Sequence, residues 1–186
     1  MSDMLTQAEI DALLNGTSGA SSDEDGDKKT VLSPEEIDAI GEIGNISMGT
    51  SATTLFTLLG YKVTITTPRV EVTNWTEMAK DHSTGYVAVK VEFTDGMKGT
   101  NLLLLKEKDV KIIADIMMGG GGKNVSGELG ELHLSAISEA MNQMIGSAAT
   151  SMSSMFNKKI NISPPTAFVL DYEKVDSIAD FSFSDG

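Results

Sequence analysis

The chain has 186 residues, enough for one domain with its own core and additional tails. Its 27 Asp and Glu against 14 Lys and Arg give a formal charge of −13, which disfavours nucleic acid and anionic membranes as partners. Cysteine is absent and the only histidines are His82 and His133, which excludes disulfide scaffolds, thiol catalysis and structural zinc sites. No window approaches the roughly 18 apolar residues of a membrane span, and no signal peptide is evident. The sequence predicts a soluble, cytoplasmic protein.

Residues 1–16 predict a short helix with its own capping signals. Thr6 is the N-cap and Glu9 closes a capping box, and the apolar face that needs a cover contains Leu5, Ile10, Leu13 and Leu14. Residues 17–31 are dominated by Ser, Gly and acidic residues and predict a disordered linker. A capped apolar helix on a flexible tether is more typical of a recognition peptide than of a helix docked on its own domain.

Residues 32–186 predict the globular domain. Ser33, Pro34 and Glu36 predict the start of a helix that ends near Leu59 before Gly60. An extended segment follows over 61–72, then a hairpin from 86–93 and 101–108, and a helix over 106–118. A second long helix over 131–157 precedes a second extended segment over 158–170. This order predicts an α+β (mixed α/β) fold, with two long surface helices packed on a β-sheet.

An internal duplication relates residues 38–72 to residues 135–169. A shift of 97 positions aligns the two segments without a gap, and 11 of the 35 pairs are identical. Chance would give roughly two or three identities, so the domain is predicted to contain a pseudo-twofold repeat. The first repeat is followed by the hairpin and a helix, but the second would reach its hairpin only near residue 183. The second repeat is therefore expected to be incomplete, as in a fragment or in a chain that a partner completes.

Each repeat carries one polar stripe on its long helix. At about 100° per residue, Asp38, Glu42, Asn45 and Gly49 fall within about 60° of one another on the first helix. On the second helix the equivalent positions are Ser135, Glu139, Asn142 and Gly146. A proline, Pro68 or Pro165, follows each Asn after the same gap of 22 residues.

A solvent-facing polar surface would explain one such stripe, but it does not explain why both copies have the same Glu and Asn. Asn is a poor helix former, so its presence in the middle of both helices indicates a functional role. The stripe glycines suit close approach of another backbone, or alternatively packing of the two helices on each other.

These residues resemble the motif of the CheC, CheX and FliY family of chemotaxis phosphatases, and the surrounding sequence looks most like the FliY branch of flagellar motor switch phosphatases. The motif is Asp or Ser, three residues, Glu, two residues, Asn, twenty-two residues and Pro, and both copies match every specified position. The resemblance covers residues 32–186 and implies a duplicated CheC-like domain.

The resemblance implies hydrolysis of the aspartyl phosphate of the response regulator CheY, which ends the signal at the motor and controls flagellar rotation. The chain would need no metal, because Mg²⁺ is expected on the receiver domain. Asn45 and Asn142 would orient the attacking water, and Glu42 and Glu139 would pair with the active-site lysine of the receiver. Asp38 and Ser135 would contact the receiver or tune the helix start, and Pro68 and Pro165 would shape the strand beneath each helix.

The N-terminal segment is similar to the peptide by which switch proteins of the FliM and FliY type capture phosphorylated CheY, which implies that Leu5, Glu9, Ile10, Asp11, Leu13 and Leu14 contact that partner. The flagellar switch proteins FliM, FliN and FliG are implied as further partners at the basal body, on the cytoplasmic face of the membrane. A non-catalytic motor adaptor that binds phosphorylated CheY through its N-terminal helix is the alternative function.

Overall fold

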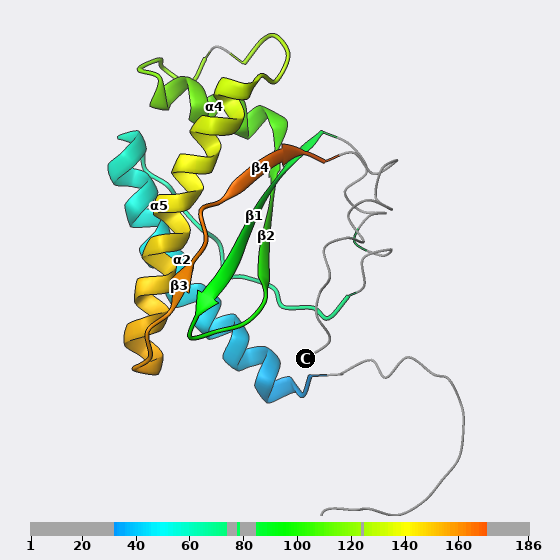
Figure 1. The fold of residues 1–186 in the computed structure, drawn as a ribbon, viewed down its shortest axis with the longest axis vertical. Helices are drawn as coiled ribbons and strands as arrows, with labels where there is room; N and C mark the ends of the chain where they lie inside the picture. The colour runs from blue at the N-terminus through cyan, green and yellow to red at the C-terminus, as the bar shows by residue number, and fades with distance from the viewer. Residues whose placement is uncertain (1–31, 74–77, 79–84, 124, 171–186) are drawn as a thin grey trace, which may run out of the picture. The chain divides into compact units, whose positions relative to one another are not determined.

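The computed structural model of the protein describes residues 32–73, 78, 85–123 and 125–170 (Figure 1). Three helices are described, namely α2 (Pro34–Leu59), α4 (Glu107–Met117) and α5 (Glu131–Phe156). The strands are β1 (Tyr86–Asp95), β2 (Thr100–Lys106), β3 (Asn161–Ile162) and β4 (Thr166–Val169). The α+β class and both long helices are as predicted. The predicted helix over 1–16, the linker over 17–31 and His82 lie outside the described residues.

Capping residues set the start of α2 and the ends of both long helices. At the start of α2, Ser33 Oγ accepts a hydrogen bond from the Glu36 amide at 3.2 Å, and Glu36 Oε2 accepts one from the Ser33 amide at 2.7 Å. Gly60 ends α2 with φ 69°, and Asn157 ends α5 with φ 47°. These two residues are 97 positions apart, so both repeats use the same left-handed cap to turn the chain out of the helix.

The sheet is built around β1. On one side β1 pairs antiparallel with β2, from Tyr86↔Lys106 to Glu92↔Thr100. On its other side it pairs with β4, and further along with β3. The predicted hairpin is confirmed, and the second extended segment adds its two short strands to the same edge of β1.

The core lies between this sheet and α5. Val87, Val89 and Val91 of β1 are at most 1% exposed and pack in one cluster with Ile137 and Met141 of α5. The described part of α5 has seven buried residues, whereas that of α2 has three, Ser47, Ser51 and Leu55. This difference in buried area makes α5 the central helix.

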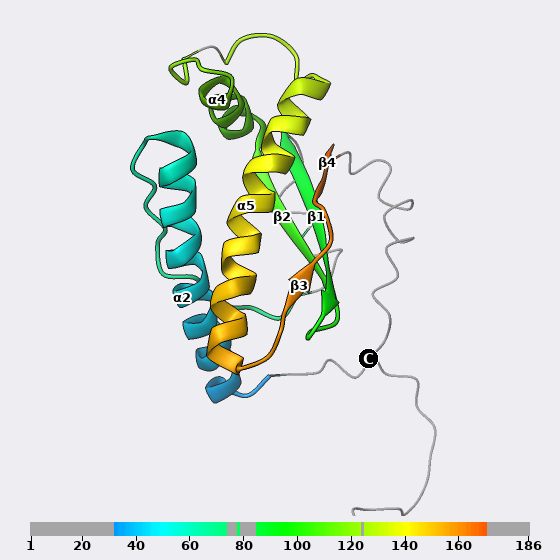
Figure 2. The ribbon, with the colours of Figure 1, turned by 60° about the vertical axis from the view of Figure 1, so that its left-hand side comes forward.

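The arrangement of the helices differs in one respect from the predicted one. Of the two long helices, α5 contacts the strands, while α2 packs on α5 and on α4. Figure 2 accordingly shows α5 between α2 and the strands. The two helices have similar apolar patterns, but the buried residues of α2 near the helix crossing are the small Ser47 and Ser51, which fit closely against another helix.

The extended segment over 61–72 forms no strand in the described part of the chain. Its equivalent in the second repeat contains β3 and β4, which occupy one edge of β1 while β2 occupies the other. The first segment instead lies alongside α2. A Cβ atom placed on Gly44 would lie 3.7 Å from Cγ of Pro68, and one placed on Gly41 would lie 3.7 Å from Cγ2 of Val70.

Candidate active site on two helices

The stripe of the first repeat lies on the solvent side of α2. Asp38, Glu42, Asn45 and Gly49 are all exposed, while Ser47, Ser51 and Leu55 are buried. The stripe thus lies apart from the buried face, but that face is narrower than the apolar pattern of the helix predicts, because Ile40 and Ile46 are each 44% exposed. One turn of helix separates the carboxylate of Glu42 from the carboxamide of Asn45, so both can meet one bound partner.

The stripe of the second repeat has the same form. Ser135, Glu139 and Asn142 are exposed along α5 and Gly146 is half-buried. The opposite side of the helix is the most buried surface of the fold, with Ile137, Met141 and Ile145 at most 1% exposed. The face of α5 that carries the second motif is thus held by the domain core.

A surface hollow of about 420 Å³ brings the second motif together. Four motif residues border it, namely Ser135, Glu139, Asn142 and Pro165, together with Leu134, Ser138, Pro164, Thr166 and Ala167. Pro165 directly precedes β4 and also forms part of the wall beside the helix. The gap of 22 residues between Asn and Pro therefore returns the chain to the same site.

In the first repeat the proline also returns to its helix. Pro68 lies against Gly44, the residue before Asn45, and Val70 lies against Gly41, the residue before Glu42. The described residues 61–73 around Pro68 form no strand, so the expected shaping of a strand there is not seen. The proline segment instead lines the helix at the level of the Glu and Asn pair.

The polar groups of the two sites are largely free to interact with a partner. In the described part of the chain, Glu42, Asn45 and Asn142 make no hydrogen bond through their side chains. Glu139 differs, because its Oε1 accepts a hydrogen bond from Nε2 of Gln143 at 2.8 Å. A free carboxamide offers both a donor and an acceptor, which is what the orientation of a water molecule requires.

The stripe glycines do not serve the contact between the helices. A Cβ atom placed on Gly49 or Gly146 would meet nothing within 4 Å, so the alternative that these glycines let α2 and α5 pack together is wrong. The helices meet instead at Ser51, whose Oγ lies 2.9 Å from the Ser47 carbonyl oxygen and 3.1 Å from that of Met144.

Neither a metal-binding cluster nor a membrane-spanning helix occurs among the described residues. Over the described ranges between residues 32 and 170, no three His, Cys, Asp or Glu side chains gather closely enough to hold a metal ion. Within the same ranges, no helix combines the length and apolar character needed to cross a membrane. The proposed partner-binding residues of the N-terminus, Leu5 to Leu14, lie outside the described residues.

Comparison with known proteins finds the duplication again. The sequence profile of the CheC-like family matches the chain twice, over residues 35–72 and 132–169, with the same offset of 97 positions. The crystal structure of Thermotoga maritima FliY is 51% identical and superimposes with a TM-score of 0.72, covering 77% of this chain and 73% of that chain. The chain belongs to the CheC-like family.

Two further relatives show how much of a relative's length the chain spans and how widely its fold is shared. The flagellar motor switch phosphatase FliY of Bacillus subtilis is 54% identical over 167 residues, which cover 90% of this CheC-like chain but 44% of that protein. The chain therefore spans less than half the length of this curated relative. The chemotaxis protein CheX of Desulfovibrio desulfuricans, at 18% identity and a TM-score of 0.55, covers 70% of this chain and 79% of that chain, and shares the fold.

Some features of the site were not found from the sequence. Ser138, Pro164 and Thr166 border the hollow because β4 lies beside α5, and neither hydrophobic pattern nor motif predicts that contact. The hydrogen bond between Gln143 and Glu139 could have been found, because a spacing of four residues brings side chains together on a helix.

Proposed function

We propose that this CheC-like chain hydrolyses the aspartyl phosphate of a CheY-type receiver protein and so ends the chemotaxis signal at the flagellar motor. The observation that carries the proposal is the exposed Glu and Asn pair present once on α2 and once on α5. In the second repeat this pair borders a hollow together with the motif proline. Identity above 50% to two FliY proteins supports the same activity.

The reaction requires little of the phosphatase beyond positioning of the attacking water and the receiver. Water attacks phosphorus, the bond between phosphorus and the aspartyl oxygen breaks, and the products are inorganic phosphate and a free carboxylate. The carboxamide of Asn45 or Asn142 would hold the attacking water in line through one donated and one accepted hydrogen bond. The receiver would bring its own Mg²⁺, so the chain supplies no cofactor in this scheme.

The Glu residues would anchor the receiver. The carboxylates of Glu42 and Glu139 are exposed one turn before the Asn residues, where each can pair with a lysine of the receiver active site. A general-base role fits less well, because an anion close to the developing metaphosphate charge would be repelled. Positioning by two side chains on a rigid helix would then supply the catalysis.

The remaining motif residues would support this contact. Asp38 and Ser135 lie one turn before the Glu residues and would touch the receiver or tune the helix start. Gly49 and Gly146 would permit close approach of the receiver backbone, since the space around both is open. Pro68 and Pro165 would fix the segment beside each helix.

The partners follow from the same proposal. Residues 1–16 would capture the phosphorylated receiver, and the predicted linker of about 15 residues would raise the local receiver concentration to near millimolar. FliM, FliN and FliG would be the neighbours of the chain in a switch complex on the cytoplasmic face of the membrane.

Single-turnover decay of a phosphorylated CheY-type receiver tests the proposal. We expect acceleration over spontaneous decay by the unmutated chain, and loss of that acceleration in the N45A/N142A double variant. Each single variant retains one intact centre, and its rate measures the activity of that centre. Loss of the acceleration with Asn45→Ala alone would therefore mean that the second centre is inactive. No acceleration by the unmutated chain, with binding still measurable, would overturn the phosphatase assignment and leave a motor adaptor.

A further inference from the structure

The two centres differ at one position beside the Glu. In the second repeat, the side-chain amide of Gln143 lies one turn after Glu139 and donates to its Oε1 at 2.8 Å. The equivalent residue in the first repeat, 97 positions earlier, is Ile46, whose side chain is 44% exposed and has no polar atom. Glu42 therefore has no such donor one turn further along its helix.

The hydrogen bond fixes one oxygen of the Glu139 carboxylate and leaves the other available. Gln143 does not border the hollow that Glu139 and Asn142 share, so it holds the carboxylate from outside the hollow. An exposed Glu side chain otherwise loses rotational freedom when it binds a partner, and that loss weakens binding. A carboxylate that is already held pays less of this cost when a cation arrives.

We infer that Gln143 is a positioning residue, which orders Glu139 for the receiver lysine and gives the second centre a higher apparent affinity for the receiver than the first. The inference rests on the proposed function, because it assigns Glu139 to the receiver. It concerns binding rather than the chemical step, since Gln143 acts through Glu139 and not on the water held by Asn142.

Single-centre variants make the inference testable. In the Asn45→Ala background, where only the second centre works, Gln143→Met keeps the side-chain length and removes the amide. We expect the receiver concentration at half-maximal rate to rise about threefold, with an unchanged maximal rate. In the Asn142→Ala background, Ile46→Gln supplies the first centre with the missing donor and is expected to lower that concentration about threefold.

The reciprocal exchange supplies its own control, because both residues are exposed on a helix and neither substitution disturbs the core. A purely structural effect would lower the maximal rate in both variants, whereas positioning moves the half-saturating concentration in opposite directions. Unchanged half-saturation in both variants, with acceleration intact, would overturn the inference and leave the proposed function standing.

A second readout separates the two proposals. The side-chain amide signals of Gln143 can be followed by nitrogen-15 NMR while a Mg²⁺ and beryllium trifluoride complex of the receiver is added. Shifts of these signals that Glu139→Gln abolishes, in a chain without hydrolytic activity, would support positioning and overturn the phosphatase assignment. No shift and no acceleration would overturn both.

Discussion

The hydroxyl of Ser51 on α2 lies 3.1 Å from the carbonyl oxygen of Met144 on α5. In the alignment of the repeats, Ser51 is equivalent to Ala148 and Met144 is equivalent to Ser47, which is itself 3% exposed beside Ser51. The helices thus cross at equivalent points of the two repeats. Each helix consequently directs its Glu and Asn stripe away from the crossing, toward solvent.

This crossing predicts that Ser51 tolerates no larger side chain. Ser51 is fully buried, so Ser51→Leu would add three carbon atoms in a packed helix contact, and we expect a loss of about 2 kcal/mol in the free energy of unfolding. Urea unfolding measures it. Thr53→Leu, at an exposed position of the same helix, is the matched control and should change stability by less than about 0.5 kcal/mol. Equal effects would contradict the close crossing.

The parts of the fold that were predicted depend on local sequence. The capping box at Ser33 and Glu36 and the cap at Gly60 act within one turn, so the limits of α2 could be predicted. The stripes could be predicted because helical spacing alone sets which residues share a face. The position of α5 on the strands and the absence of a strand over 61–72 could not, because both depend on which edge of β1 is occupied.

The candidate site divides in the same way. The duplication singled out Glu42, Asn45, Glu139 and Asn142, and the structure places all four on exposed helix faces. The hollow beside Pro165 needs β4 and α5 to lie side by side, which no local signal gives. The helix-packing explanation of the stripe glycines failed because small residues elsewhere, Ser47 and Ser51, form the crossing.

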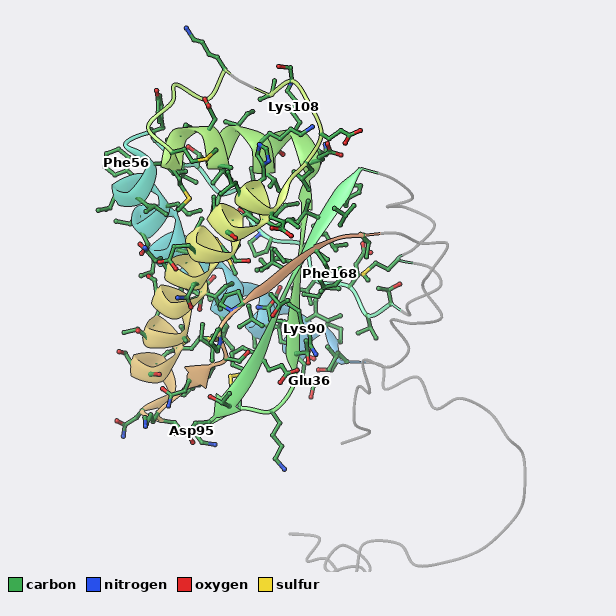
Figure 3. All side chains as sticks on the ribbon, turned by 45° about the horizontal axis from the view of Figure 1, so that its top comes forward. Glu36, Phe56, Lys90, Asp95, Lys108 and Phe168 are labelled. Atoms are coloured by element: carbon green, nitrogen blue, oxygen red, sulfur yellow. The ribbon has the colours of Figure 1, made fainter. Side chains whose placement is uncertain are left out.

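The turn of the hairpin predicts a second sensitive position at Gly96. Its φ is +80°, and a Cβ atom there would clash with the carbonyl oxygen of Lys159, in the segment after α5. Figure 3 marks the neighbouring Asp95 at the end of β1. We expect Gly96→Ala to lower the free energy of unfolding by at least about 2 kcal/mol, through left-handed strain and the clash.

Thermal unfolding of Gly96→Ala checks this, and Gly121→Ala is the control. Gly121 is exposed, has no positive φ, and a Cβ atom there would meet nothing within 4 Å. A similar shift of the midpoint in both variants would mean that the contact with Lys159 does not constrain the hairpin.

The open space around the stripe glycines predicts that substitution by alanine raises stability but lowers activity. Gly49→Ala and Gly146→Ala fill no contact within the domain and replace a poor helix former, so each should raise the free energy of unfolding by about 0.5–1 kcal/mol. The added methyl groups stand on the face proposed to meet the receiver. Receiver dephosphorylation should therefore slow in the stabilised double variant, and an undiminished rate would show that close approach does not occur at these glycines.

A buried lysine predicts how the loop between α4 and α5 is held. Lys111 is 8% exposed, and its Nζ lies 2.6 Å from the Gly127 carbonyl oxygen and 2.5 Å from Glu107 Oε1. Lys111→Met keeps the apolar stem but leaves both oxygens without this donor. Because hydrogen bonds to charged groups contribute about 1.5–3 kcal/mol, we expect a loss of about 2 kcal/mol in stability.

Hydrogen exchange distinguishes a local effect from a general one. Amides of residues 125–130 should exchange faster in Lys111→Met than the global loss of stability explains, because the lysine joins that segment to α4. Lys108, labelled in Figure 3, is exposed on the same helix, and Lys108→Met should leave both exchange and stability nearly unchanged. If the segment exchanged equally in the two variants, Lys111 would be dispensable for the loop, and the start of α5 would depend on the capping hydrogen bond from the Gly130 amide to His133 Nδ1 instead.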